Sequence, residues 1–232
     1  MSVAHQDVNT YNSDGRIIQV EYAMKAMNLG TTTIGIRLKD HVIIVSEKKL
    51  ANSLQSPQSI KKHFKIYDTI LAGISGVSGD APTIIKKCRN ICLNHEKIYN
   101  EQISAENLME DICALALKFG EQKMEKKIFS RPFGVSLLIG VYENGPKLYS
   151  VDPSGSYLEY KARCIGSAQE VVETILESDY DSFNELEQSI SKALGILKNV
   201  MKEKINKMNV EVSVVGSDGV VTFTPEQISQ YI

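Results

Sequence analysis

Residues 31–48 read TTTIGIRLKDHVIIVSEK, and this stretch decides the fold. It holds two runs rich in β-branched residues, 31–38 and 41–48, which are separated only by Lys39 and Asp40. β-Branched side chains favour strands, and a short polar break between two such runs is typical of a hairpin. We therefore expect an antiparallel pair of strands near the start of the chain.

Similar runs follow along the chain, mostly in pairs. The turn-forming dipeptide Asn144–Gly145 separates two of them, which again predicts a hairpin. We expect further strands at 64–67, 69–75, 134–142, 146–152, 157–161, 210–215 and 220–223. Pairs of neighbouring runs with short connections predict sheets that are antiparallel.

Helical periodicity appears between the strand blocks. A short helix is expected at 18–28, with Val20, Met24 and Met27 on one apolar stripe. Gly30 is its expected C-cap. The other expected helices lie at 81–99, 105–124, 168–178 and 184–205, with a short one from Pro225. The apolar face of the helix at 81–99 consists of Ile84, Ile85, Cys88, Ile91 and Cys92. That of the helix at 105–124 consists of Leu108, Ile112, Leu115 and Phe119. Strand blocks alternating with paired helices predict an α+β fold, a four-layer αββα sandwich.

The composition indicates one folded domain over residues 1–232. At 43% hydrophobic residues the chain can bury a large core, and no repeat or linker interrupts it. Its 26 Lys and Arg balance 28 Asp and Glu, so we expect no nucleic-acid and no membrane partner. No apolar run approaches the ~20 residues that span a bilayer, and no signal peptide begins the chain, which predicts a protein that stays inside the cell.

Neither the cysteines nor the histidines have the spacing of a metal site. Cys88, Cys92, Cys113 and Cys164 lie in apolar patterns without a CxxC pair, so we interpret them as reduced core thiols. The well-separated His41, His63 and His95 receive no role, and residues 123–127, KMEKK, are expected to form a solvated loop. We expect no metal and no cofactor.

A family resemblance begins at residues 14–36, DGRIIQVEYAMKAMNLGTTTIGI. This segment resembles the N-terminal signature of proteasome alpha subunits, in which a GR-x-x-QVEYA helix leads into the first strand. Further matches are SGVSGDA at 75–81, SRPFGVSLLIG at 130–140, DPSG at 152–155 and IGSAQE at 165–170. The resemblance runs almost from end to end, and SRPFGV together with residues 196–212 looks most like the alpha-type-5 branch.

The resemblance implies a role inside a larger particle. It implies the sandwich of N-terminal-nucleophile hydrolases and a place among other alpha subunits in a seven-membered ring. That ring stacks on a ring of catalytic beta subunits and docks a regulatory ATPase particle or other activators. It further implies ubiquitin-dependent protein degradation in the cytoplasm and nucleus, with no catalysis by the chain itself.

Gly30 and Thr31 raise the alternative of a peptidase. Active beta subunits are cleaved after such a glycine, and the exposed threonine becomes the nucleophile, with its own amine as base. By the resemblance, Thr31 would be that nucleophile, Glu47 would replace the usual aspartate and Lys62 would match the lysine. While Gly30 remains attached, the Thr31 nitrogen is an amide and cannot take a proton, and Glu47 carries an extra methylene. We interpret the three positions as degenerate.

The first residues resemble the gate of the family only in part. Residues 1–16 correspond to the gate-side tail and 17–29 to the N-terminal helix, and the resemblance assigns Asp14, Gly15 and Tyr22 to the gate. The usual YDR motif is replaced by residues 4–6, Ala-His-Gln, and the usual Ser-Pro turn by residues 12–13, Asn-Ser. The alternative is a terminus without fixed structure.

The resemblance also places an activator pocket between neighbouring alpha subunits. There, Lys62 corresponds to the lysine that pairs with the C-terminal carboxylate of an activator tail. Gly30 and Gly76 correspond to glycines that let the tail approach, and Arg16 and Ile17 to the wall beside it. A lysine in a basic run is more often part of a solvated face, which is the competing interpretation.

Three functions remain open on the sequence alone. The preferred one is a non-catalytic ring subunit. The second is a catalytic threonine peptidase released by cleavage between Gly30 and Thr31, and the third is an alpha-like chaperone ring with no protease partner.

Overall fold

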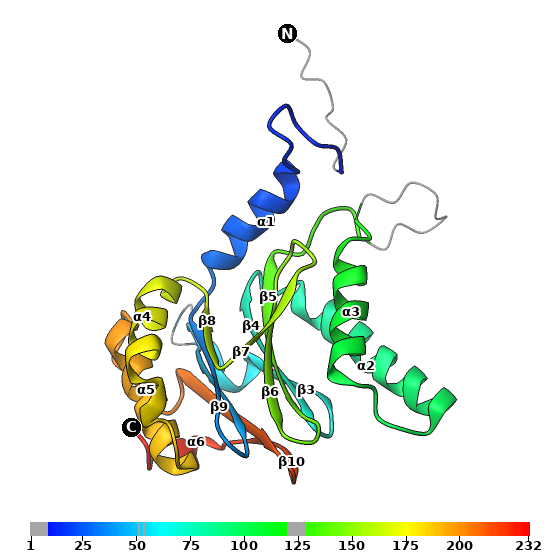
Figure 1. The fold of residues 1–232 in the computed structure, drawn as a ribbon. Coiled ribbons are helices and arrows are strands. Elements are labelled where there is room, and N and C mark those ends of the chain that lie inside the picture. Colours follow the sequence, from blue (N-terminus) through cyan, green and yellow to red (C-terminus); the bar gives the residue numbers. More distant parts are fainter. Residues whose placement is uncertain (1–8, 51, 53, 120–128) are drawn as a thin grey trace.

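The structure is a computed structural model that describes residues 9–50, 52, 54–119 and 129–232. Two five-stranded antiparallel sheets face each other, and helices cover both outer faces (Figure 1). The α+β four-layer arrangement predicted from the sequence is confirmed. Within the described residues, no helix combines the length and the apolar character needed to cross a bilayer.

The first sheet contains the hairpin predicted at the start of the chain. Its strands, in spatial order, are β10 (Gly219–Thr222), β9 (Val210–Gly216), β2 (Val42–Glu47), β1 (Thr33–Arg37) and β8 (Ala162–Ile165). In the β1–β2 pair, Thr33 lies opposite Ser46 and Arg37 lies opposite Val42. The start of β1 and the end of β2 therefore lie side by side.

The second sheet is a meander that follows the chain. Its strands are β3 (His63–Tyr67), β4 (Ile70–Gly76), β5 (Val135–Tyr142), β6 (Pro146–Val151) and β7 (Tyr157–Tyr160). Asn144 and Gly145 both have positive φ angles, 52° and 137°, in the turn between β5 and β6. The hairpin predicted from this dipeptide is confirmed.

Strand β8 was not predicted. The sequence pattern indicated one strand at 157–161, whereas the chain forms β7, passes through Lys161 alone, and continues as β8 in the other sheet beside β1. Only Lys161 connects the two strands, and no glycine or proline lies between Tyr157 and Ile165 to mark the change of sheet. A pattern of local hydrophobicity contains no signal for such a crossing.

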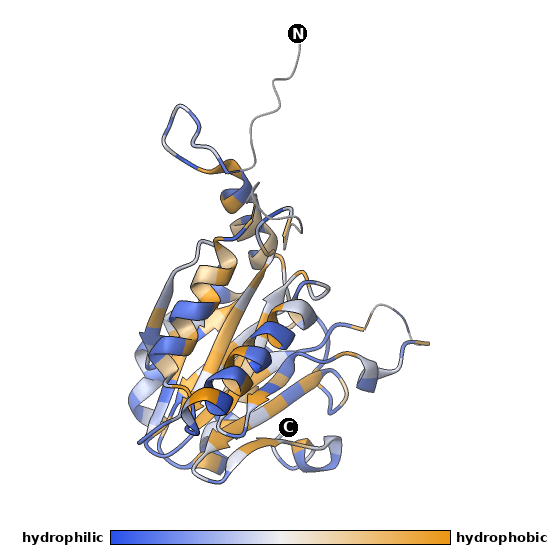
Figure 2. Ribbon diagram, turned by 90° about the vertical axis from the view of Figure 1, so that its right-hand side faces the viewer, coloured by the Kyte–Doolittle hydropathy of each residue, from blue (hydrophilic) through white to orange (hydrophobic). Residues whose placement is uncertain are grey.

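Two helix pairs form the outer layers. Helices α2 (Ala81–Tyr99) and α3 (Ala105–Ala116) pack on the second sheet, and α4 (Gln169–Asp179) and α5 (Leu186–Val200) pack on the first. A third apolar cluster, which includes Ile44 and Leu138, lies between the sheets. Figure 2 shows hydrophobic colour along the strands, and both hydrophilic and hydrophobic colour on the helices that cover them.

Two helices are shorter than predicted. Helix α3 ends at Ala116 instead of 124, and its last carbonyls are capped by the backbone N–H of Leu117, while residues 120–128, including the predicted 123–127 loop, lie outside the described residues. Helix α5 spans 186–200 instead of 184–205. It stops because Met201 is extended and the Asn206 side chain then organises a turn by accepting N–H groups of Met208 and Asn209.

The short helix predicted from Pro225 and the core cysteines are confirmed. The 3-10 turns η1 (Pro57–Ser59) and η2 (Tyr180–Ser182) are connectors, and α6 (Pro225–Ile228) begins with a capping box. All four cysteines are buried and form no disulfide, and burial raises the pKa of each thiol. They behave as core side chains.

Helix α1 (Ile18–Asn28) stands at one end of the sandwich and extends beyond the strands (Figure 1). It contacts β4 and β5 and buries Ala23 and Met27. The predicted stripe is therefore confirmed at Met27, whereas Val20 and Met24 are only half-buried. The end of the sandwich beneath this helix, here called the α1 end, collects the candidate site residues.

Candidate functional site at the α1 end

Gly30 and Gly76 pack against each other where α1 passes into β1. A Cβ atom on Gly30 would lie 2.0 Å from the backbone nitrogen of Gly76, and a Cβ on Gly76 would lie 2.2 Å from the carbonyl oxygen of Gly134. Gly76 also has a φ of +113°. Close approach of three backbone segments thus requires glycine at both positions. The role of these glycines in admitting an activator tail stays a prediction.

The Gly30–Thr31 junction is held on both sides by hydrogen bonds. The carbonyl of Gly30 accepts the N–H of Ser167 at 2.9 Å, and the carbonyl of Thr31 accepts the hydroxyl of Ser75 at 2.9 Å. In the unbroken chain the Thr31 nitrogen is an amide whose lone pair is delocalised. The threonine hydroxyl therefore has no amine beside it to serve as a base.

Lys62 is buried at the same end. Its relative exposure is 6%, and burial lowers its pKa to about 8, against the raising effect of Glu47 and Glu211. Among the described residues, no carboxylate forms an ion pair with its ammonium. The predicted alternative of a solvated lysine therefore does not hold for this chain, since the side chain is enclosed and its charge is only partly balanced.

Glu47 and Glu211 form the negative side of this environment. The N–H of Glu47 donates to the carbonyl of Thr32 at 2.9 Å, and Glu47 acts electrostatically on Lys62, so the three positions predicted to be degenerate, Thr31, Glu47 and Lys62, share one end of the sandwich. Burial raises the pKa of Glu211, although the N–H of Lys62 and the charge of Lys48 oppose that shift.

The candidate gate residues are exposed, with Asp14 and Gly15 in the turn before α1 and Tyr22 within the helix. The Asn12 side chain accepts the N–H groups of Asp14 and Arg16, both at 2.9 Å, and Gly15 has a φ of +72° in this turn. Tyr22 is 57% exposed. Residues 4–6, which replace the YDR motif, lie outside the described residues. The gate assignment stays a prediction.

One chain does not bring together all the residues of the predicted activator pocket. Arg16 is exposed and pairs with Glu21 at 3.0 Å, and Ile17 precedes the first residue of α1. At ~1.5 Å per residue, the 11 residues of α1 place these two about 16 Å along the helix axis from Gly30. Arg16 and Ile17 therefore lie at the other end of α1 from Lys62, and a pocket containing all three requires a second subunit.

Comparison with known proteins decides the family. The profile described as "Proteasome subunit" matches residues 27–215, and a second profile, which describes the N-terminal signature of the A-type proteasome subunits, matches residues 5–26. The chain belongs to the proteasome subunit family. Its N-terminal region is of the alpha type, as the resemblance of residues 14–36 predicted.

Curated relatives confirm the resemblance to the alpha-type-5 branch of the proteasome family. A probable alpha type-5 proteasome subunit of Encephalitozoon cuniculi is 55% identical over 98% of both chains. The probable alpha type-5 subunit of Schizosaccharomyces pombe is 42% identical over 91% of this chain and 87% of its own length. The alpha type-5 subunit of Trypanosoma brucei brucei is 40% identical over 97% and 93%, respectively.

Two motifs of the proteasome resemblance meet beside α1. The two terminal guanidinium nitrogens of Arg131, in SRPFG, donate to the carboxylate of Asp80, in SGVSGDA, at 2.8 and 2.9 Å. Asp80 also accepts the N–H of Gly134 at 3.0 Å. Partial burial alone would raise the pKa of Asp80, but the hydrogen bonds from Arg131 and Gly134 lower it overall. These hydrogen bonds fix the segment Arg131–Gly134, which lies next to α1.

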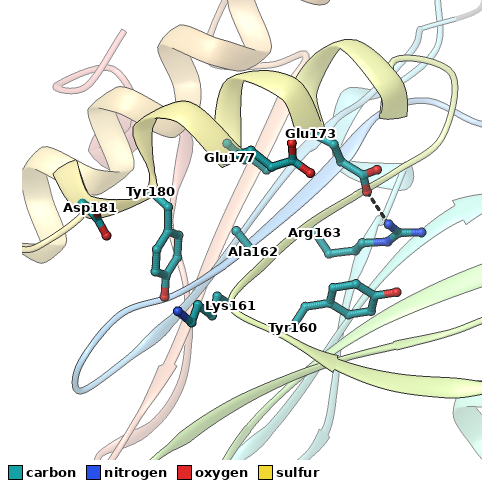
Figure 3. Close-up of a pocket in the computed structure, with 9 residues that line it drawn as sticks. Tyr160, Lys161, Ala162, Arg163, Glu173, Glu177, Tyr180 and Asp181 are labelled. Carbon is teal, nitrogen blue, oxygen red and sulfur yellow. Dashed lines mark ion pairs between the residues drawn. The ribbon is translucent and has the colours of Figure 1, made fainter.

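A hollow of about 380 Å³ lies elsewhere, between α4 and the β7–β8 connection. Figure 3 shows Glu173 and Glu177 on the helical wall and Tyr160 and Arg163 on the strand wall. Arg163 pairs with Glu173 at 2.7 Å, and its guanidinium lies 4.7 Å from the centre of the Tyr160 ring. None of the site residues predicted from the sequence lines this hollow.

The sequence analysis missed His63. The structure buries this histidine between the sheets, where it bonds Ser46 and Ser213, each at 2.8 Å. A weak signal was present, because Ser46 and Ser213 interrupt apolar runs in their strands, whereas His63 follows two lysines. It pointed to no metal or nucleophile, and pairing residues so distant in sequence requires the fold.

Proposed function

We propose that this chain is a non-catalytic alpha-ring subunit of a 20S proteasome core, acting as scaffold, pore gate and docking surface for activators. The observation that carries the proposal is helix α1, which directly precedes the Gly30–Thr31 junction, packs against β4 and β5, and lies largely within the match to the A-type N-terminal signature. Cleavage at that junction would be needed to create a threonine nucleophile. It would also remove the helix that buries Ala23 and Met27 against β4 and β5.

The docking role is supported by Lys62. A buried ammonium without a contacting carboxylate is electrostatically incomplete, and an incoming C-terminal carboxylate would complete it. Arg16 and Ile17 lie too far from Lys62 in one chain, so the pocket would combine Lys62 of one subunit with the outer α1 end of its neighbour. This agrees with docking at the boundary between two ring members.

The assembly and its location are part of the same proposal. The partners would be other alpha subunits in a seven-membered ring, a ring of beta subunits, and a regulatory ATPase particle or another activator. The particle would degrade ubiquitin-marked proteins in the cytoplasm and nucleus. The tail before α1 would take part in closing the pore, with Tyr22, Asp14 and Gly15 at the junction.

Purification from the native cell through a tag on this chain tests the proposal. We expect catalytic beta subunits and threonine-type peptidase activity to co-elute in a particle of several rings. A ring of alpha-like subunits without beta partners would instead favour the chaperone alternative and overturn the proposal. Substitution of Thr31 by Ala in the same strain is the control, and it should leave the peptidase activity of the particle unchanged.

A further inference from the structure

A chain of polar side chains crosses the apolar interior at the α1 end. The His63 ring on β3 lies 2.8 Å from the hydroxyl oxygen of Ser46 through Nε2 and 2.8 Å from that of Ser213 through Nδ1. The chain continues on one side to Thr33 at 2.8 Å and on the other to Thr222 at 2.9 Å. It joins β10, β9, β2 and β1 of one sheet to β3 of the other.

One end of the chain sets the direction of its hydrogen bonds. Thr33 donates its hydroxyl proton to the carbonyl oxygen of Ile74 at 2.9 Å, and a carbonyl can only accept. Because Thr33 has a single hydroxyl proton, the Ser46 hydroxyl must donate to Thr33. Ser46 is then left to accept, so the His63 Nε2 must carry a proton.

The other side of the ring follows from the same counting. A neutral imidazole with a proton on Nε2 has a bare Nδ1, which accepts from the Ser213 hydroxyl. Ser213 in turn accepts from the Thr222 hydroxyl. Thr33, Ser46 and Ser213 thus each donate once and accept once, and His63 is held as the neutral Nε2–H tautomer. Burial, with the charges of Lys62 and Lys48, lowers the pKa of His63 to about 3, in agreement with a neutral ring.

The Ser46–His63 pair has the spacing of a nucleophile and its base, but it is not a hydrolytic site. Ser46 and Ser213 have no exposed surface, and His63 is 5% exposed. A substrate carbonyl could not reach the Ser46 hydroxyl. The chain therefore serves the structure of the α1 end.

Two side chains of strand β9 bind the neighbouring residues Lys62 and His63. The Glu211 carboxylate accepts the N–H of Lys62 at 2.9 Å, and Ser213, two residues further along β9, bonds the His63 ring. The carbonyl of Lys62 accepts the N–H of Ile74 at 3.0 Å. The backbone of Lys62 is thus fixed between the two sheets.

We propose that His63 is a positioning residue for Lys62. Through its one-directional chain of hydrogen bonds it pins the start of β3 to the opposite sheet and keeps the Lys62 ammonium enclosed at the α1 end. The purpose of this enclosure, a preformed site for an activator carboxylate, rests on the proposed function. The enclosure itself does not depend on it.

Chemical labelling of lysines in the full chain tests the positioning role without any activator. An amine-acylating reagent is applied, and the rate at Lys62 is compared with that at exposed Lys61 by site-resolved mass spectrometry. We expect His63→Leu to raise the Lys62-to-Lys61 ratio about tenfold, the factor that the loss of one buried hydrogen bond is worth. His63→Gln, which keeps one donor and one acceptor, should stay near the wild-type ratio.

A folded His63→Leu chain with the wild-type ratio would overturn the positioning role. Unchanged labelling of Lys147, which pairs with Glu106 on another face, reports that the fold is retained. If His63→Leu does not fold, Ser213→Ala removes only the hydroxyl that bonds Nδ1, and it should also raise the ratio. Because the labelling involves no activator, a failed docking experiment cannot be mistaken for failure of this inference.

The tautomer has its own spectroscopic test. The sequence contains four histidines, and ¹⁵N-histidine labelling with a His63→Gln comparison identifies the signal of His63. We expect a ring whose protonated nitrogen couples to both carbon-bound ring protons, as Nε2 does, and which does not titrate between pH 5.5 and 8. A proton on Nδ1, or titration in that range, would contradict the directed chain.

Discussion

The backbone nitrogen of Lys62 lies 2.9 Å from the Oε2 atom of Glu211, although 149 residues separate them in the chain. This hydrogen bond connects the two sheets at the α1 end, because Glu211 lies on β9 and Lys62 directly precedes β3. It also places a carboxylate beside the buried ammonium without an ion pair to it. The backbone of Lys62 is therefore fixed, while its enclosed ammonium forms no ion pair with Glu211.

Replacing Lys62 should weaken activator docking at this subunit. We expect Lys62→Ala to reduce crosslinking of an activator C-terminal peptide to this chain roughly tenfold to a hundredfold, because a charge-assisted hydrogen bond is lost. Crosslinking to the one subunit avoids masking by other pockets of a ring. Lys61→Ala is the matched control, since Lys61 is exposed. Equal crosslinking of both variants would remove the assignment.

Adding a methyl group at Gly30 should destabilise the chain. The new Cβ would lie 2.0 Å from the Gly76 nitrogen, which is backbone and cannot move aside cheaply. Gly30→Ala should lower the free energy of unfolding by about 1–3 kcal/mol or more. Denaturant unfolding of the full chain measures this. Gly195→Ala, in α5 with open space around it, should be neutral or stabilising, and a similar loss at both sites would refute the explanation.

His63 should make the chain less stable in acid. Its pKa is about 3 in the folded state and near 6.5 when unfolded, so between these values the unfolded chain binds more protons and stability falls as pH falls. From pH 7 to pH 5 the loss should be about 2 kcal/mol. The difference between wild type and His63→Gln in unfolding free energy, followed with pH, isolates this contribution. A difference that does not vary with pH would be contrary to a neutral buried ring.

The loop beneath α1 should depend more on Asp80 than on Arg131. Asp80 accepts hydrogen bonds from Arg131 and Gly134, and its side chain is 17% exposed against 54% for Arg131. Asp80→Ala should cost about 1–3 kcal/mol, because a buried N–H loses its acceptor. Arg131→Ala should cost about 0–1 kcal/mol, as for an exposed ion pair. Unfolding measurements that give the reverse order would show that the pair, and not the Gly134 contact, matters.

The sequence predicted the layers well because they depend on local patterns. The β-branched runs around Thr33 and Val42 indicated a hairpin, and the stripe through Ile84 and Cys88 indicated a helix on a sheet. It did not predict β8, whose change of sheet at Lys161 involves no turn residue. The predicted ends of α3 and α5 were also wrong, because their C-cap residues, Leu117 and Met201, are not the glycine or asparagine that usually marks a helix end.

The candidate site residues were selected by resemblance, and their physical state required the structure. Family resemblance selected Lys62, Gly30 and Gly76, yet no pattern could show that Lys62 is buried or that the two glycines touch. The His63 chain was missed for the same reason. Ser46 and Ser213 are adjacent to His63 only after two sheets have packed, so their bonds are a property of tertiary structure.

The most direct test is the intact mass of this subunit isolated from its native particle. We predict a mass that includes the residues before Thr31, with helix α1 retained and the Thr31 nitrogen in peptide linkage. A mature protein that begins at Thr31 would contradict the account, because the free amine would then stand beside the threonine hydroxyl as its base.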